Sequence, residues 1–173
     1  MDYRIRLLIV ARNAPHRQVM RAWLADAADV TIVGEALGEP EALTLTGQWQ
    51  PDVVLLGVEA LGLDDLQAVA RLHARYPHSK VIVFSHSDDQ EHLALEVLRE
   101  GAWGYLAGGR SRPPERSSEA STEGFGMSAQ SNVQPEGRSR RRLVEAIRTV
   151  ARGGSILSPG MAGRILDELS QSC

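Results

Sequence analysis

The sequence is poor in cysteine and lysine and has no long apolar run, and these absences restrict where the protein works. Its one cysteine, Cys173, cannot form an internal disulfide. No apolar run approaches the roughly 20 residues that a membrane span needs, and the apolar stretch near the N-terminus is too short for a signal peptide. These features favour the cytoplasm or another reducing compartment. The net charge of −3 gives no general argument for nucleic-acid binding.

Apolar and amphipathic segments alternate from Ile5 to Leu106. The segments predicted as strands, because they are apolar or β-branched, are 5–10, 30–33, 52–56, 80–84 and 103–106. The segments predicted as helices, because their apolar residues recur at helical spacing, are 15–25, 39–48, 65–75 and 89–99. This alternation is typical of βαβ units around a parallel sheet. Continuous apolar strands fit a sheet that is covered on both faces.

The periodicity ends in the segment from Arg110 to Ser139, which is rich in serine, glycine and proline. Such a composition cannot offset the entropy of ordering, so we predict a disordered insert over 110–139. A further amphipathic helix is predicted over 143–151, and a last helix over 161–169 after Ser158-Pro159.

The segments IRLLIVARNAPHRQVMRAWL, QPDVVLLGVEALGLDDL, KVIVFSHSDDQ, GAWGYL and LVEAIRTVARGG occur in an order that resembles the receiver domain of NarL/FixJ-class response regulators. The resemblance covers nearly the whole chain outside the insert. It implies a flavodoxin-like (βα)5 fold, α/β, with a parallel five-stranded sheet of order 2-1-3-4-5. The receiver core would span 1–109, the insert 110–139, and the fifth helix and C-terminal linker helix of the same domain 140–173.

In that family a carboxylate after the third strand accepts a phosphoryl group. Two acidic residues after the first strand help it to hold Mg²⁺. Carried onto this sequence, the acceptor position falls on Gly57, the acidic pair on Ala11 and Arg12, and the family's lysine on Gly108. The only lysine in the chain, Lys80, starts the fourth strand instead.

Two positions keep the residue types of the family's switch, namely Ser85 after the fourth strand and Tyr105 in the fifth. The resemblance therefore implies an atypical, aspartate-less receiver with no catalytic residue, no cofactor and no metal. Arg12 would place a fixed positive charge where the metal usually sits, and beside Ser85 it could hold an anion; alternatively its side chain extends into solvent. Gly57 and Ser85 also fit purely structural roles, as a permissive loop residue and a satisfied core hydroxyl.

Our leading hypothesis is a regulatory module for signal transduction or transcription regulation that works without phosphorylation. It would act through protein–protein contacts, as a homodimer or with a partner protein. The surface concerned is formed by the fourth helix, fifth strand and fifth helix: 89–99, 103–106 and 143–152. DNA would be contacted only through an output domain that is absent from this chain, and no membrane contact is expected.

Two other functions are compatible with the sequence to different degrees. The emptied receiver pocket could serve as a sensor site for a small ligand or an anion. An enzyme on the same fold is disfavoured, because the strand ends carry Ala11, Gly57 and Gly108. The basic run of Arg138 and 140–142 comes just before the predicted helix 143–151, where positive charge opposes the macrodipole. It could contact an acidic partner or nucleic acid, or lie in solvent.

Overall fold

The computed structural model describes residues 3–58, 62–85, 91–107 and 135–154, together with 167, 170 and 171. The elements are β1 (Ile5–Val10), α1 (Ala14–Leu24), β2 (Val30–Ala36), α2 (Glu39–Trp49), β3 (Val53–Val58), α3 (Leu63–Arg75), β4 (Lys80–Ser85), α4 (Glu91–Arg99), β5 (Gly104–Ala107) and α5 (Pro135–Ala151). From β1 to β5 each element lies where the periodicity predicts it, with bounds that differ by three residues or fewer.

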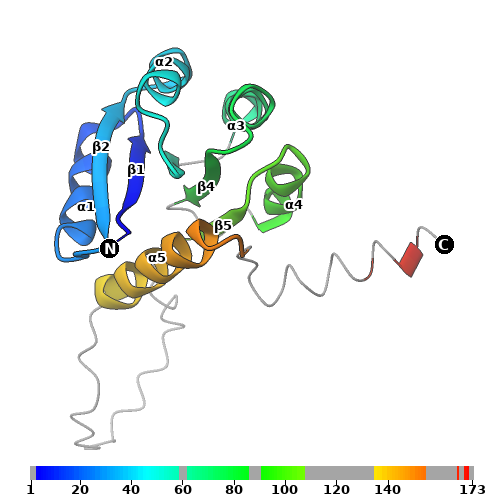
Figure 1. Cartoon of the computed structure of the whole chain (residues 1–173). Helices are drawn as coiled ribbons and strands as arrows, with labels where there is room; N and C mark the ends of the chain where they lie inside the picture. Colours follow the sequence, from blue (N-terminus) through cyan, green and yellow to red (C-terminus); the bar gives the residue numbers. More distant parts are fainter. Residues whose placement is uncertain are drawn as a thin grey trace, which may run out of the picture.

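The five strands form one parallel sheet of order β2-β1-β3-β4-β5, so the predicted flavodoxin-like fold is confirmed. Figure 1 shows α2, α3 and α4 in a row on one side of the sheet, with α1 and α5 on the other. Right-handed crossover connections carry the chain between neighbouring parallel strands in such folds. Among the described residues, no helix is long and apolar enough to cross a bilayer.

The core has two halves, one on each face of the sheet, because successive strand residues point to opposite faces. Along β3, Val54 and Leu56 pack under α2, α3 and α4, whereas Val53 and Leu55 pack under α1 and α5. Every residue of β3 is buried. A central strand that is covered on both faces explains the continuous apolar run in its sequence.

Helix α5 begins at Pro135, well before the predicted start at 143, so residues 135–139 are helical where the sequence predicts disorder. Proline is favourable in the first turn of a helix, because the backbone N–H groups there have no carbonyl partner within the helix and proline lacks only such a group. The turn that follows is held by an ion pair between Arg140 and Asp26, and an arginine-rich turn shows no apolar periodicity in the sequence. The remainder of the predicted insert, and all of the predicted helix 161–169 except Asp167, lie outside the described residues.

Candidate functional site

The site that the sequence points to lies at the carboxyl edge of the sheet, where β1, β3 and β4 end side by side. Gly57 of β3 is in register with Phe84 of β4, and the next pair is Val58 with Ser85. On the other side of β3, the last pair with β1 is Val10 with Leu56, so Ala11 follows directly beside Gly57. The fold therefore brings Ala11, Gly57 and Ser85 together, and Gly108 lies outside the described residues.

The space beside Gly57 is filled by two side chains of α1. A Cβ atom on Gly57 would lie 2.7 Å from Cε of Met20 and 3.0 Å from Cε1 of His16. Both side chains are buried, and the His16 ring also packs on Phe84, with the ring centroids 5.9 Å apart. At the predicted acceptor position the structure thus has a packed core contact in place of a carboxylate.

Sequence reasoning missed this contact, although its signal is present in the spacing. His16 and Met20 are four residues apart on a helix, so they lie on one face. Which strand that face covers depends on how α1 packs against the sheet, and no local pattern gives this.

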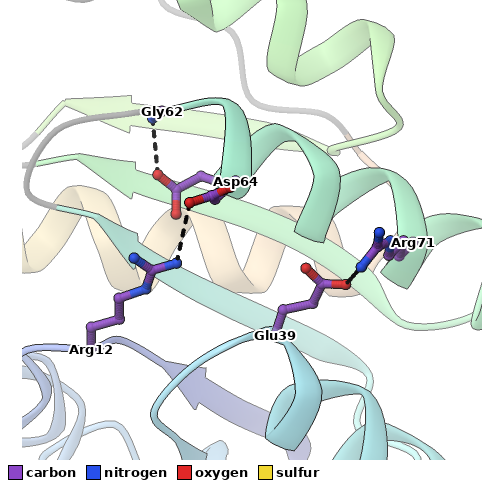
Figure 2. Close-up of polar contacts among 6 residues, drawn as sticks. Arg12, Glu39, Gly62, Asp64 and Arg71 are labelled. Atoms are coloured by element: carbon purple, nitrogen blue, oxygen red, sulfur yellow. Dashed lines mark hydrogen bonds and ion pairs between the residues drawn. The ribbon is translucent and has the colours of Figure 1, made fainter.

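The side chain of Arg12 points toward Asp64 at the start of α3 (Figure 2). Its guanidinium lies 3.9 Å from a carboxylate oxygen of Asp64, and the two side chains are 72% and 78% exposed. An exposed pair of this kind contributes little to stability. Of the two roles left open for Arg12, the solvent-exposed one agrees with this geometry.

The magnesium ion that phosphorylated members of the resembled family hold does not fit the residues at these positions. Mg²⁺ is held by carboxylate oxygens together with water. Ala11 is buried and apolar, Gly57 has no side chain, and Arg12 brings a positive charge. Among the described residues, no group of three or more histidine, cysteine, aspartate or glutamate side chains is placed to hold a metal ion.

The loop after β1 is fixed by Arg17, a residue that the sequence analysis did not single out. One guanidinium nitrogen of Arg17 donates to the carbonyl oxygen of Ala11 at 2.6 Å and to that of Arg12 at 3.3 Å. Hydrogen bonds from a charged donor are stronger than neutral ones. Protein donors therefore hold this loop in place without a metal ion.

The start of α3 is organised by Asp65, whose carboxylate accepts a hydrogen bond from the Gly62 N–H at 2.9 Å. Partial burial raises the pKa of Asp65, although the Gly62 hydrogen bond and the charge of Arg12 act in the opposite direction. Figure 2 also shows the ion pair between Glu39 and Arg71, which ties α2 to α3. These contacts fix the start of α3 and its position relative to α2.

Ser85 and Tyr105 are both fully enclosed by the fold, with 0% and 3% of their surfaces exposed. Tyr105 is in register with Val83, two residues before Ser85, so the two polar residues are diagonal neighbours on one face of the sheet. Tyr105 belongs to the half of the core that α3 and α4 cover.

Lys80 lies at the opposite edge of the sheet, where β4 begins, and cannot replace the lysine of the family. Its ammonium donates to the carbonyl oxygen of Val150 at 3.0 Å and lies 4.9 Å above the ring of Trp103. A cation at the C-terminal end of α5 satisfies a free helix carbonyl and complements the macrodipole. The role of Lys80 is therefore structural.

A parallel sheet of this order, with its loops gathered at one carboxyl edge, defines a flavodoxin-like α/β domain, the class of fold that receiver domains have. The family model of the response regulator receiver domain matches residues 7–108, more than half of the chain. The chain belongs to the response regulator receiver domain family.

Relatives of known name agree with this assignment. The transcriptional regulatory protein DegU of Brevibacillus brevis is 25% identical over 167 residues, which cover 96% of this chain and 58% of that protein. A protein-glutamate methylesterase/protein-glutamine glutaminase of Rhodopseudomonas palustris is 29% identical over 164 residues, which cover 93% of this chain and 44% of that protein. The chain thus spans about half the length of these relatives.

A solved structure resembles the fold over most of its length. It is the signal receiver domain of the response regulator NarL from Mycobacterium tuberculosis, with a TM-score of 0.62 and 23% identity. The match covers 87% of this chain and 98% of that one. At this identity the similarity shows the fold alone.

Proposed function

We propose that this receiver domain acts through protein–protein contacts without being phosphorylated. The observation that carries the proposal is the packing at Gly57. Glycine has no side-chain atom that could accept a phosphoryl group, and Met20 and His16 fill the space beside it. Ala11 and Arg12 offer no carboxylate for the metal ion that would neutralise charge on the phosphoryl oxygens.

The interaction surface that we propose is the face formed by α4, β5 and α5, in a homodimer or in a complex with a partner protein. Ser85 and Tyr105 support it, because they keep the residue types that connect the family's phosphorylation site to this face. With no phosphoryl group to shift a population between two arrangements, the surface is constitutive or is controlled by another ligand.

The packing favours this function over a small-ligand or anion sensor at the carboxyl edge. The side chain of Arg12, the one cation expected there, points to Asp64, and α1 occupies the space at Gly57. We propose no enzymatic activity for the domain itself, because Ala11 and Gly57 leave two strand ends without a reactive group.

The wider role that we propose is signal transduction or transcription regulation in the cytoplasm. The name of the DegU relative supports it. Contact with DNA would belong to an output domain outside the 173 residues. We further propose that the segment between β5 and Pro135 is an insert in the receiver domain, not a linker between two domains.

Intact-mass spectrometry after incubation with acetyl phosphate and Mg²⁺ tests the proposal. We expect the mass to be unchanged. The matched control restores the missing groups with Ala11→Asp, Arg12→Asp and Gly57→Asp, and makes room for them with Met20→Ala. A phosphoryl adduct on the natural chain would contradict the proposal.

A further inference from the structure

An exposed aromatic and basic surface lies at the amino edge of the sheet, where β1, β3 and β4 begin. Among the described residues, the large apolar side chains that remain exposed include two aromatic ones, Tyr3 at 67% and Trp49 at 43%. Tyr3 lies just before β1, and Trp49 is the last residue of α2, so both belong to this edge. A single exposed aromatic side chain is ordinary, whereas two at one edge indicate a contact surface.

Asp52 ties the N-terminus of the chain to this edge. Its carboxylate accepts hydrogen bonds from the Arg6 N–H, at 2.9 Å, and from the Tyr3 hydroxyl. The hydrogen bond to Asp52 raises the pKa of Tyr3, because it stabilises the protonated hydroxyl. It also fixes the polar end of a ring that is mostly exposed. The ring of Tyr3 is therefore already held in place for contact with a partner.

The ends of α2 and α3 belong to the same surface. The hydroxyl of Tyr76, which follows α3, packs directly against Gly47 in the last turn of α2. Ser79, three residues after Tyr76, donates from its hydroxyl to the Pro51 carbonyl oxygen at 2.7 Å. The short loop 50–52 between α2 and β3 therefore has Trp49 at one end and the contact with the N-terminus at the other.

Three arginines at this edge carry charge that no ion pair neutralises. Arg4, Arg6 and Arg75 are exposed, and none of them has an ion pair in the part of the chain that the structure describes. Arg6 is directed to the side of the sheet that α2 and α3 cover, because its neighbours in β1 pack on the other half of the core. Arg75 lies 5.8 Å from the centroid of the Tyr76 ring. Unpaired positive charge thus surrounds the exposed rings.

We propose that this amino-edge surface docks a short acidic segment of a partner protein. The surface is formed by Tyr3, Arg4, Arg6, Trp49, Asp52 and Arg75. An apolar side chain of the segment packs on the rings of Trp49 and Tyr3, and its carboxylates bind the three arginines. The proposal rests on the proposed function, since it names a surface and a chemistry for the partner contact, and this surface is distinct from the α4–β5–α5 face.

The residue types at the amino-edge surface are those of a protein interface. Tryptophan, tyrosine and arginine are enriched among the few residues that dominate the binding energy of such interfaces. The planar guanidinium group of arginine also matches a carboxylate with two parallel hydrogen bonds. Because Asp52 is the one carboxylate among the six residues, the surface carries a net charge of +2 and favours an acidic occupant.

A short peptide fits the amino-edge surface better than a nucleic acid or an anionic membrane. The chain carries a net charge of −3, so the residues outside this surface carry −5. Charges act over only about 8 Å at physiological salt, so a short peptide responds mainly to the arginines. A long polyanion or a bilayer extends beyond them and meets the negative remainder. Base stacking also requires free ring faces, and Arg75 already lies over the ring of Tyr76.

The test is an NMR titration of the ¹⁵N-labelled full chain, at physiological salt, with a short synthetic peptide in which glutamates surround one phenylalanine. The indole signals of Trp23 and Trp103, which pack on the other half of the core, are internal controls for that of Trp49. We expect a saturable shift of the Trp49 signal, with Arg6→Glu weakening binding roughly tenfold. Arg142→Glu, at an exposed and unpaired arginine of α5, is the matched charge reversal and should change the affinity less than about twofold.

A second variant on another element, Arg75→Glu, should weaken binding as well. Results that would overturn the proposal are no shift at Trp49, equal weakening by Arg6→Glu and Arg142→Glu, or undiminished binding of a peptide with glutamine in place of glutamate. Tighter binding of a single-stranded oligonucleotide or of phosphatidylserine vesicles, lost with Arg6→Glu, would overturn it too. If Trp49 does not respond while the protein stays unmodified by acetyl phosphate, the docking proposal fails and the proposed function stands. A phosphoryl adduct would instead overturn the function.

Discussion

At the scale of single residues, the proposal that this receiver domain is not phosphorylated depends most on Gly57. Its position is buried, and the side chains of Met20 and His16 stand where its own would begin. The terminal methyl of Met20 is flexible, yet it lies in a filled core. Any side chain at position 57 must therefore displace atoms of α1.

A double-mutant cycle measures this displacement. Gly57→Ala should destabilise the protein by about 1–3 kcal/mol, because overpacking forces neighbours off their preferred positions. Met20→Ala alone should cost about 2–5 kcal/mol through the cavity it leaves. The double variant should cost less than the sum, because each change relieves the other. Urea unfolding gives the four free energies.

The control for this cycle is Gly34→Ala in strand β2, where the added carbon would lie 3.3 Å from a methyl carbon of Leu8. Gly34→Ala should lower the free energy of unfolding by less than Gly57→Ala does, and its effect should be additive with that of Met20→Ala. Strict additivity of Gly57→Ala and Met20→Ala would show that the packing described at Gly57 is wrong.

At the scale of elements, α5 is attached to the rest of the domain by charged contacts at its polar side. Arg148 lies within the range 143–152 that was predicted to contribute to the interaction surface. Its guanidinium binds both carboxylate oxygens of Asp29 in the loop before β2. That hydrogen bond lowers the pKa of Asp29 and raises the pKa of Arg148.

The pH dependence of stability follows from this pair. A carboxylate whose pKa is lowered in the folded state stabilises the fold above its unfolded pKa of about 3.9. That contribution is lost as the pH falls through the lower folded value. Asp29→Asn should therefore cost about 0.2–1 kcal/mol at pH 7, a small amount because both side chains are about 40% exposed.

The measurement is urea unfolding of the natural protein and of Asp29→Asn at pH 7 and below pH 4. The difference in free energy should shrink as the pH falls. Asp64→Asn, whose partner Arg12 is 3.9 Å away, is the matched control and should have a smaller effect at pH 7. If the unfolding free energies of the natural protein and of Asp29→Asn differ by the same amount at both pH values, the account is contradicted.

The sequence predicted the elements well and the contacts between them poorly. The strands and helices up to Arg99 could be predicted from the spacing of apolar residues, because each helix buries one apolar face and each central strand buries two. The early start of α5 was missed because its first turns are polar and are held by a contact with Asp26, far away in the sequence. The roles of Met20, Arg17 and Lys80 depend on which element packs on which, so no local pattern could supply them.

At the scale of the whole molecule, the account predicts association without phosphorylation. Light scattering of the unmodified protein should show a dimer or a larger species at micromolar concentration. Arg152→Glu should weaken it, since Arg152 is exposed after the end of α5 and has no ion pair among the described residues. Arg148→Glu is a poor probe, because it would also break the contact with Asp29.

The central claim, that the domain does not respond to a phosphoryl group, is tested most directly with beryllofluoride, a mimic of that group. Amide NMR spectra of the ¹⁵N-labelled protein would be compared with and without beryllofluoride and Mg²⁺. Our account predicts superimposable spectra, because Ala11, Arg12 and Gly57 offer no carboxylate to the metal or to the mimic. Saturable shifts of the Ser85 and Tyr105 signals would contradict it.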